Sequence, residues 1–96
     1  MDKYEIMFIV KTTLEESVVK STVESLTSII TDMKGKVEGS KDMGQRELAY
    51  PIKKEISGFY YVLTVEASHE AIAEFDRKAR LNENILRHQI IKLDEE

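Results

Sequence analysis

Two apolar periodicities alternate along this 96-residue chain, and their order limits the possible folds more than any other feature of the sequence. Residues 4–10 and 58–65 are short runs of aliphatic, β-branched and aromatic side chains, a pattern that predicts strands buried on both faces. Residues 19–33 and 71–79 instead carry apolar side chains at helical spacing, which predicts one apolar stripe on each of two helices. The stripes are Val19, Val23, Leu26, Ile30 and Met33 in the first helix and Ala71, Ile72, Phe75 and Ala79 in the second.

Local signals predict where the two helices begin and end. Thr13 and Glu16 have the spacing of a capping box, which indicates the start of the first helix. Gly35 suits the left-handed residue that follows a helix C-terminus. We expect Ser68 to cap the second helix, and residues 82–84 to end it.

Two further strands complete the set. Within residues 36–54, Val37 and the run 48–52 have strand character, although Gly39 and Gly44 break the alternation between them, and residues 85–93 form the last strand. Val37 and Leu48 have opposite parity, so a bulge must separate them if both face the core. Pro51 cannot donate a ladder hydrogen bond, which places this strand at a sheet edge. A polar turn is expected over residues 53–57. In the last strand the pattern leaves open whether Leu86, His88 and Ile90 or Ile85, Gln89 and Ile91 face the core.

The order strand, helix, strand, strand, helix, strand predicts an α+β fold. Right-handed crossovers put both helices on the same side of the sheet. The result is the ferredoxin-like βαββαβ arrangement, a four-stranded antiparallel sheet with two helices on one face. The two richest strands, 4–10 and 58–65, should be central. A chain of this length forms one domain over residues 1–96, and we expect a short acidic tail at 94–96.

One face of such a sheet remains without helices. If Phe8 and Leu63 point toward the helices, alternation turns their neighbours to the open face. A solitary protein rarely exposes an apolar patch of this kind, so the pattern predicts a protein partner there. The alternative is a register that is wrong by one residue, which would exchange the two faces. The residues expected to bind the partner are Met7, Ile9, Tyr60 and Val62.

The composition argues against catalytic and metal chemistry. The chain has no cysteine, which excludes disulfides and thiolate sites. His69 and His88 lie in different predicted elements without metal-ligand spacing, and neither a phosphate loop nor a nucleophile elbow is present. We therefore expect no enzyme, no cofactor, no metal and no small-molecule substrate. The longest apolar run, residues 6–10, is far shorter than the roughly twenty residues of a membrane span, and no signal peptide is evident, so we expect a cytoplasmic protein without membrane contact.

The charge is distributed unevenly. A net charge of −4 argues against a nucleic-acid partner, because such proteins usually carry a basic surplus. Residues 34–54, however, hold six positive against three negative side chains, and residues 77–92 hold five against one. A basic margin can bind RNA phosphates locally, and neighbouring tyrosines can stack on unpaired bases. The alternative is ordinary solvated lysine and arginine, with the tyrosines in the core.

One segment resembles a known family. Residues 44–54 read Gly-Gln-Arg-Glu-Leu-Ala-Tyr-Pro-Ile-Lys-Lys, which is similar to the signature of the sixth protein of the bacterial small ribosomal subunit. In that family a glycine, a basic residue two positions on, and Leu-Ala-Tyr-Pro-Ile followed by a basic residue recur in the second strand. Residues 4–6, 65–67 and 84–87 agree as well, so the resemblance covers essentially the whole chain in order.

The resemblance implies a function as well as a ferredoxin-like fold. It implies a non-catalytic ribosomal component that binds small-subunit rRNA in the central domain, as a heterodimer with the eighteenth small-subunit protein. The acidic tail at 94–96 is shorter than the glutamate-rich tail of some members, so a role tied to that tail is not carried over. A small-ligand regulatory module of the same fold is the alternative, and it would need a concave pocket with convergent polar groups.

Eight residues are expected to contact RNA. The cationic ones would pair with backbone phosphates, and the tyrosines would pack on ribose or base. The resembling motifs supply Arg46, Tyr50, Lys53 and Arg87, whereas Tyr4, Lys54, Arg80 and Lys92 follow from charge and position.

Overall fold

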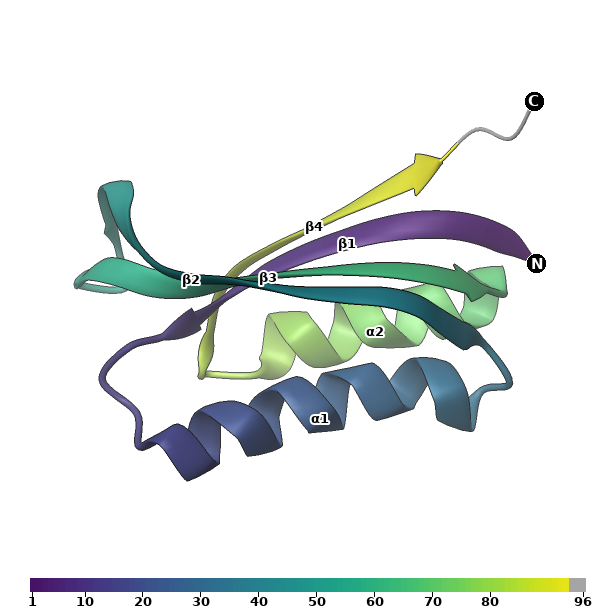
Figure 1. Cartoon of the computed structure of the whole chain (residues 1–96), viewed down its shortest axis with the longest axis horizontal. Coiled ribbons are helices and arrows are strands. Elements are labelled where there is room, and N and C mark those ends of the chain that lie inside the picture. Colours follow the sequence, from purple (N-terminus) through teal and green to yellow (C-terminus); the bar gives the residue numbers. More distant parts are fainter. Residues whose placement is uncertain (94–96) are drawn as a thin grey trace.

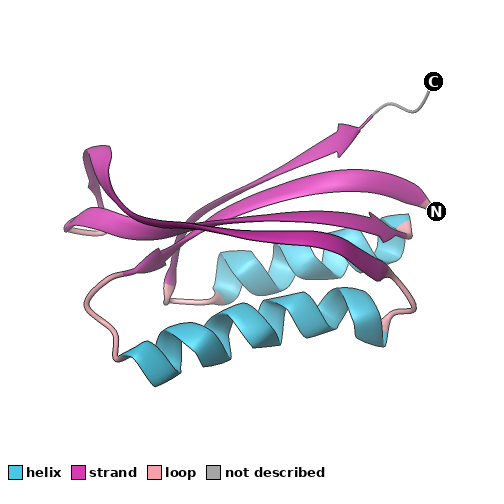
Figure 2. Cartoon of the chain, in the orientation of Figure 1, coloured by secondary structure: helices cyan, strands magenta, loops and turns pink. Residues whose placement is uncertain are grey.

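Two helices cover one face of a four-stranded antiparallel sheet, and no helix within residues 1–93 covers the other face, called here the helix-free face (Figures 1 and 2). The computed structural model describes residues 1–93, so the expected tail at 94–96 lies outside the described residues. The predicted ferredoxin-like βαββαβ fold is confirmed. Its elements are β1 (Asp2–Lys11), α1 (Glu16–Asp32), β2 (Lys36–Ile52), β3 (Glu55–Ala67), α2 (His69–Leu81) and β4 (Ile85–Leu93).

The strand order in the sheet is β2-β3-β1-β4. The two apolar strands are therefore central, as predicted, and the strand with Pro51 is an edge. The pairing of β2 with β3 shifts register between Val37 and Gly39 and again between Asp42 and Gly44. No helix of the described part of the chain combines the length and the apolar character needed to cross a bilayer.

The core lies between the sheet and the helices. Ile6, Phe8 and Leu63 point into it with no exposed surface, which confirms the predicted register of the central strands. The ring of Phe8 stacks on Tyr61 at 5.5 Å between centroids and contacts Phe75 of α2 at 6.2 Å. Each such side chain contributes about 1.5–3 kcal/mol when it is fully buried. Both helices add the faces predicted from their stripes, although Met33 is exposed beyond the end of α1.

The start of α1 differs from the prediction. The N-cap is Glu15, whose side chain makes no capping hydrogen bond, and Thr13 lies outside the helix. The expected capping box is therefore wrong, because the chain uses residues 12–15 to pass from the sheet layer to the helix layer (Figure 1). At α2 the predicted cap is confirmed, since the Ser68 hydroxyl accepts a hydrogen bond from the Ala71 amide at 3.2 Å.

The residues that follow α1 also differ from the prediction. Lys34, not Gly35, adopts the left-handed conformation, with φ of 67°. The Gly35 amide donates to the Ile30 carbonyl oxygen at 2.8 Å, the closing bond of a Schellman motif. A Cβ on Gly35 would lie only 2.8 Å from that oxygen, so the position needs glycine for close approach.

The β2–β3 hairpin bends its tip away from the helices (upper left in Figure 1). Its two-residue turn consists of Lys53 and Lys54, both with positive φ. Leu48 is half-buried and lines a depression together with Ile9 on the helix-free face. Leu48 is therefore not a core residue, because β2 has two bulges between Val37 and Leu48 where the expectation needed one, and two bulges cancel and leave the two residues on opposite faces.

The register of β4 is now defined. His88 and Ile90 pair with Phe8 and Ile6 and so face the helices. The register then shifts between Ile9 and Val10, which lets Ile85 pair with Val10 and enter the core as well. The two alternatives that the sequence left open are thus both partly realised, because a bulge separates them.

Candidate RNA and partner interfaces

Two contacts bring the hairpin tip to the start of β4. Lys53 Nζ donates to the carbonyl oxygen of Ile85 at 3.0 Å, across 32 positions of sequence. The Arg87 guanidinium donates to the Tyr50 hydroxyl, across 37 positions. Tyr50 keeps 56 % of its surface exposed, so a face of its ring remains available for stacking.

A third cation reaches the same place from α2. Lys53, Arg80 and Arg87 line one depression of about 320 Å³ between the end of α2 and the start of β4. Arg80 pairs with Asp76 and still has 69 % of its side chain exposed. We call the set Tyr50, Lys53, Arg80 and Arg87 the basic junction. Cations that converge in this way favour a phosphate group.

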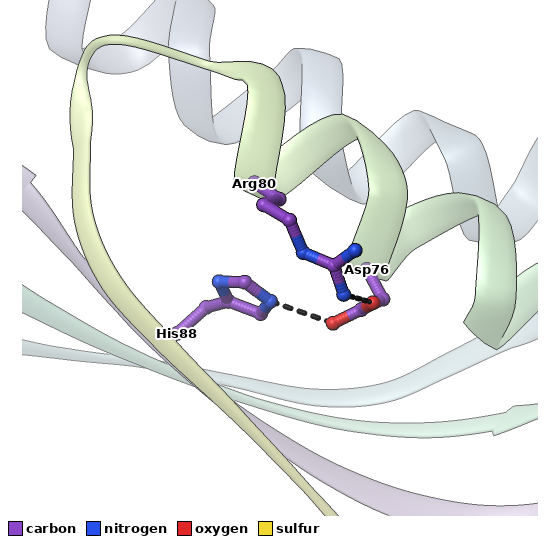
Figure 3. A network of polar contacts seen from close by, with 3 residues as sticks. All are labelled: Asp76, Arg80 and His88. Atoms are coloured by element: carbon purple, nitrogen blue, oxygen red, sulfur yellow. Dashed lines mark hydrogen bonds and ion pairs between the residues drawn. The ribbon is translucent and has the colours of Figure 1, made fainter.

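A polar network fixes α2 against β4 beside the basic junction (Figure 3). His88 Nε2 lies 2.7 Å from Asp76 Oδ1, and Arg80 contacts the other carboxylate oxygen. The hydrogen bond from His88, followed by the charges of Arg80 and His88, lowers the pKa of Asp76 despite partial desolvation. The network therefore orients Arg80 at the margin of the depression.

Arg46 and Lys54 lie on the hairpin but outside the basic junction. Lys54 is exposed in the turn, and Arg46 is exposed on β2, where its Nε donates to the Met43 carbonyl oxygen at 3.4 Å. Arg46 pairs with Gly58, so its side chain starts from the helix-free face. Both cations extend the basic surface along the hairpin.

The structure separates two predicted residues from this surface. Tyr4 is only 7 % exposed and packs in the core in line with Ile6, so its ring has no free face for a base. Lys92 lies toward the far end of β4, where its Nζ is 3.6 Å from the Asp2 carboxylate. Neither joins the basic junction, because strand alternation buries one and the length of β4 removes the other.

The predicted partner residues form cross-strand pairs on the helix-free face. Met7 pairs with Val62 and Ile9 with Tyr60. Met7, Tyr60 and Val62 are half-buried. Ile9, however, is 3 % exposed, so the expectation that it offers surface to a partner is wrong for the chain alone. Ile9 packs closely over Gly58, its diagonal neighbour on β3, where a Cβ would lie 2.2 Å from Ile9 Cγ2.

Sequence reasoning missed three apolar residues of this face. Leu48 and Ile52 of the hairpin line the depression that also contains Met7 and Tyr60. Ile91 of β4 pairs with Glu5 and is 44 % exposed beside the same patch. Ile91 lies on the same face of β4 as Gln89, and this alternation was visible in the sequence. The sequence did not decide which face of the strand pointed to the core, so Ile91 was not selected. We call Met7, Tyr60, Val62 and Ile91 the apolar patch.

Comparison with known proteins agrees with the fold. The family model for ribosomal protein S6 matches residues 3–92 of this chain. Among solved structures, the 30S ribosomal protein S6 of Thermotoga maritima superposes with a TM-score of 0.90 at 31 % identity. The alignment covers 96 % of this chain and 87 % of that one.

The family match defines a role at a coarse level. Proteins of this family are RNA-binding structural components of the small subunit that serve translation on cytoplasmic ribosomes, and they are not enzymes. The predictions of a ribosomal, non-enzymatic protein are thereby confirmed. The chain belongs to the ribosomal protein S6 family and is a structural component of the small ribosomal subunit.

Proposed function

We propose that the protein binds the central domain of small-subunit rRNA as a heterodimer with the eighteenth small-subunit protein. One observation carries the proposal: Tyr50 and Arg87 of the basic junction line the same depression as Met7 and Tyr60 of the apolar patch. An RNA-binding surface and a protein-binding surface are thus continuous, as a protein held between RNA and a partner requires.

The basic junction and the hairpin would form the RNA side. Lys53, Arg80 and Arg87 would each pair with a backbone phosphate, with Lys54 and Arg46 further along the hairpin. Each phosphate neutralised adds about 0.7–0.9 to the slope of log affinity against log salt. The Tyr50 ring would stack on a base or a ribose, with its hydroxyl held by Arg87.

The apolar patch would form the protein side. Covering Ile91, which is 44 % exposed, removes apolar surface from water and so favours the complex. Few cations converge on this chain, so its affinity for RNA alone is expected to be weak. A partner that adds basic surface next to the junction raises affinity without any new contact by this protein.

The test is binding to a central-domain rRNA fragment by fluorescence anisotropy, with the chain alone, the partner alone and the two together. The expected result is weak binding by each protein and tight binding by the pair. Equal affinity of the chain with and without the partner would contradict the heterodimer. Failure of the pair to bind the fragment would contradict the RNA target.

A further inference from the structure

A groove on the helix side of the sheet belongs to neither surface described so far. It runs between α1 and the strands β2 and β3, and its volume is about 570 Å³. Its floor is apolar and contains two aromatic rings. The floor residues are Val19, Val23, Phe59 and Tyr61.

The rim of the groove is negatively charged. Glu16 and Glu24 lie two helical turns apart on α1, and Asp42 faces them from β2. Among the described residues that line the groove, Lys20 is the one cation. Asp42 pairs with Tyr61 across the strands, and its charge adds to burial in raising the pKa of the Tyr61 hydroxyl. The carboxylate charge thus acts on the floor of the groove as well as on its edge.

Gly44 of β2 also lines the groove. It has φ of 78°, a left-handed conformation that favours glycine. Its amide donates to Asp42 Oδ1 at 2.8 Å, which holds that carboxylate at the rim. A side chain that enters the groove therefore meets a carboxylate of fixed position at its rim.

We propose that this groove receives an arginine side chain from a basic segment of a neighbouring protein in the small subunit. A planar guanidinium can lie over an aromatic ring and donate to carboxylates at its edge, which matches an aromatic floor with an acidic rim. Three carboxylates repel phosphate, so the groove does not suit RNA. A second copy of this chain, with a net charge of −4, is repelled as well.

The proposal adds a second protein contact and does not depend on the identity of the first. The groove lies on the helix side, whereas the apolar patch lies on the helix-free face. The two surfaces can therefore be occupied at the same time, and each can be disabled without the other.

Photo-crosslinking in purified small subunits tests the occupant. Lys20 is replaced by p-benzoylphenylalanine in the full chain, and Ser28, an exposed residue of α1 that does not line the groove, is replaced in a matched control. The expected result is a crosslink from position 20, absent from position 28, to a protein peptide that contains arginine. A crosslink from position 20 to rRNA alone, or none above the control, overturns the proposal.

Charge reversal tests the chemistry. Glu24→Lys, combined with the photo-reactive residue at position 20, should lower the crosslink yield at least tenfold, whereas Asp32→Lys on the same helix should leave it unchanged. An equal yield in both variants overturns the proposal. Binding of the rRNA fragment by each variant with the eighteenth protein is measured in parallel. Unchanged binding separates a failure of this inference from a failure of the proposed function.

Discussion

Lys53 Nζ donates a hydrogen bond to the Ile85 carbonyl oxygen at 3.0 Å and thereby joins the hairpin tip to β4. The turn that supplies this lysine is strained, because Lys53 and Lys54 have φ of 50° and 68°. Left-handed backbone costs an L-residue about 1–2 kcal/mol, and a two-residue turn of this kind favours Asn-Gly. The chain thus keeps two cations at its tip at a cost in stability, which is consistent with a binding role.

Replacing the two turn lysines should make the protein more stable and its RNA binding weaker. Lys53→Asn with Lys54→Gly should raise the free energy of unfolding by about 1 kcal/mol, since relief of strain exceeds the loss of one hydrogen bond. The same variant should bind the rRNA fragment more weakly in the presence of the partner. Chemical denaturation and anisotropy measure the two effects. No gain in stability would show that the turn is unstrained in solution.

The arginine and the lysine on β4 should contribute differently to the salt dependence of RNA binding. Arg87→Ala should lower the slope of log affinity against log salt by about 0.7–0.9, the value for one phosphate contact. Lys92→Ala should leave the slope unchanged, because Lys92 lies toward the far end of the strand beside Asp2. Equal effects would mean that the RNA contact extends along all of β4.

The apolar patch should be sensitive to a single charge. Val62→Asp should abolish heterodimer formation, because it puts a carboxylate between Met7 and Lys41, the cross-strand neighbours of Val62. Analytical ultracentrifugation with the eighteenth protein measures the association. Ile56→Asp, at an exposed hairpin residue outside the patch, is the control and should leave the heterodimer intact. Intact association of a folded Val62→Asp variant would contradict the assignment of this face.

Two leucines should show which apolar residues form the core. Leu26→Ala should cost about 2–5 kcal/mol, because Leu26 is fully buried under the sheet. Leu48→Ala should cost about 1 kcal/mol or less, because Leu48 is half-buried on the helix-free face. Urea denaturation compares them. Equal losses would restore Leu48 to the core and contradict the observed register of the hairpin.

The core residues of strands and helices with an unbroken repeat were predicted correctly from the sequence. Strand alternation assigned Phe8 and Leu63 to the core correctly, and helical spacing assigned Phe75, because each element keeps one repeat throughout. The core assignment failed where bulges interrupt a strand: two bulges in β2, not the expected one, leave Leu48 on the face opposite Val37, and one bulge in β4 turns Ile85 into the core. A bulge inserts a residue without leaving a fixed mark on composition, so the sequence alone does not locate it.

The candidate sites depended on contacts between distant segments. Charge and motifs selected Lys53 and Arg87, but only the bend of the hairpin brings them to one depression. The same bend, together with close packing on Gly58, buries Ile9, which the pattern had assigned to open surface. Such long-range contacts follow from packing, which a local pattern does not specify.

The contact between Asp76 and His88 should make stability depend on pH. The folded structure lowers the pKa of Asp76 from its usual 3.8, chiefly through the hydrogen bond from His88. Between the folded and the unfolded pKa the unfolded chain binds more protons, so folding gains stability from this group. That contribution is complete above the unfolded pKa and is lost as the pH falls through the folded pKa.

Asp76→Asn tests this linkage because it retains the shape of the side chain and removes its titration. The melting temperature of the natural chain, followed by circular dichroism, should fall more steeply than that of the variant between about pH 5 and pH 2. His88→Gln should flatten the dependence too, and Arg80→Ala should flatten it less, because His88 is the larger cause of the pKa shift. Parallel curves for Asp76→Asn and the natural chain would show that the contact between α2 and β4 does not persist in solution.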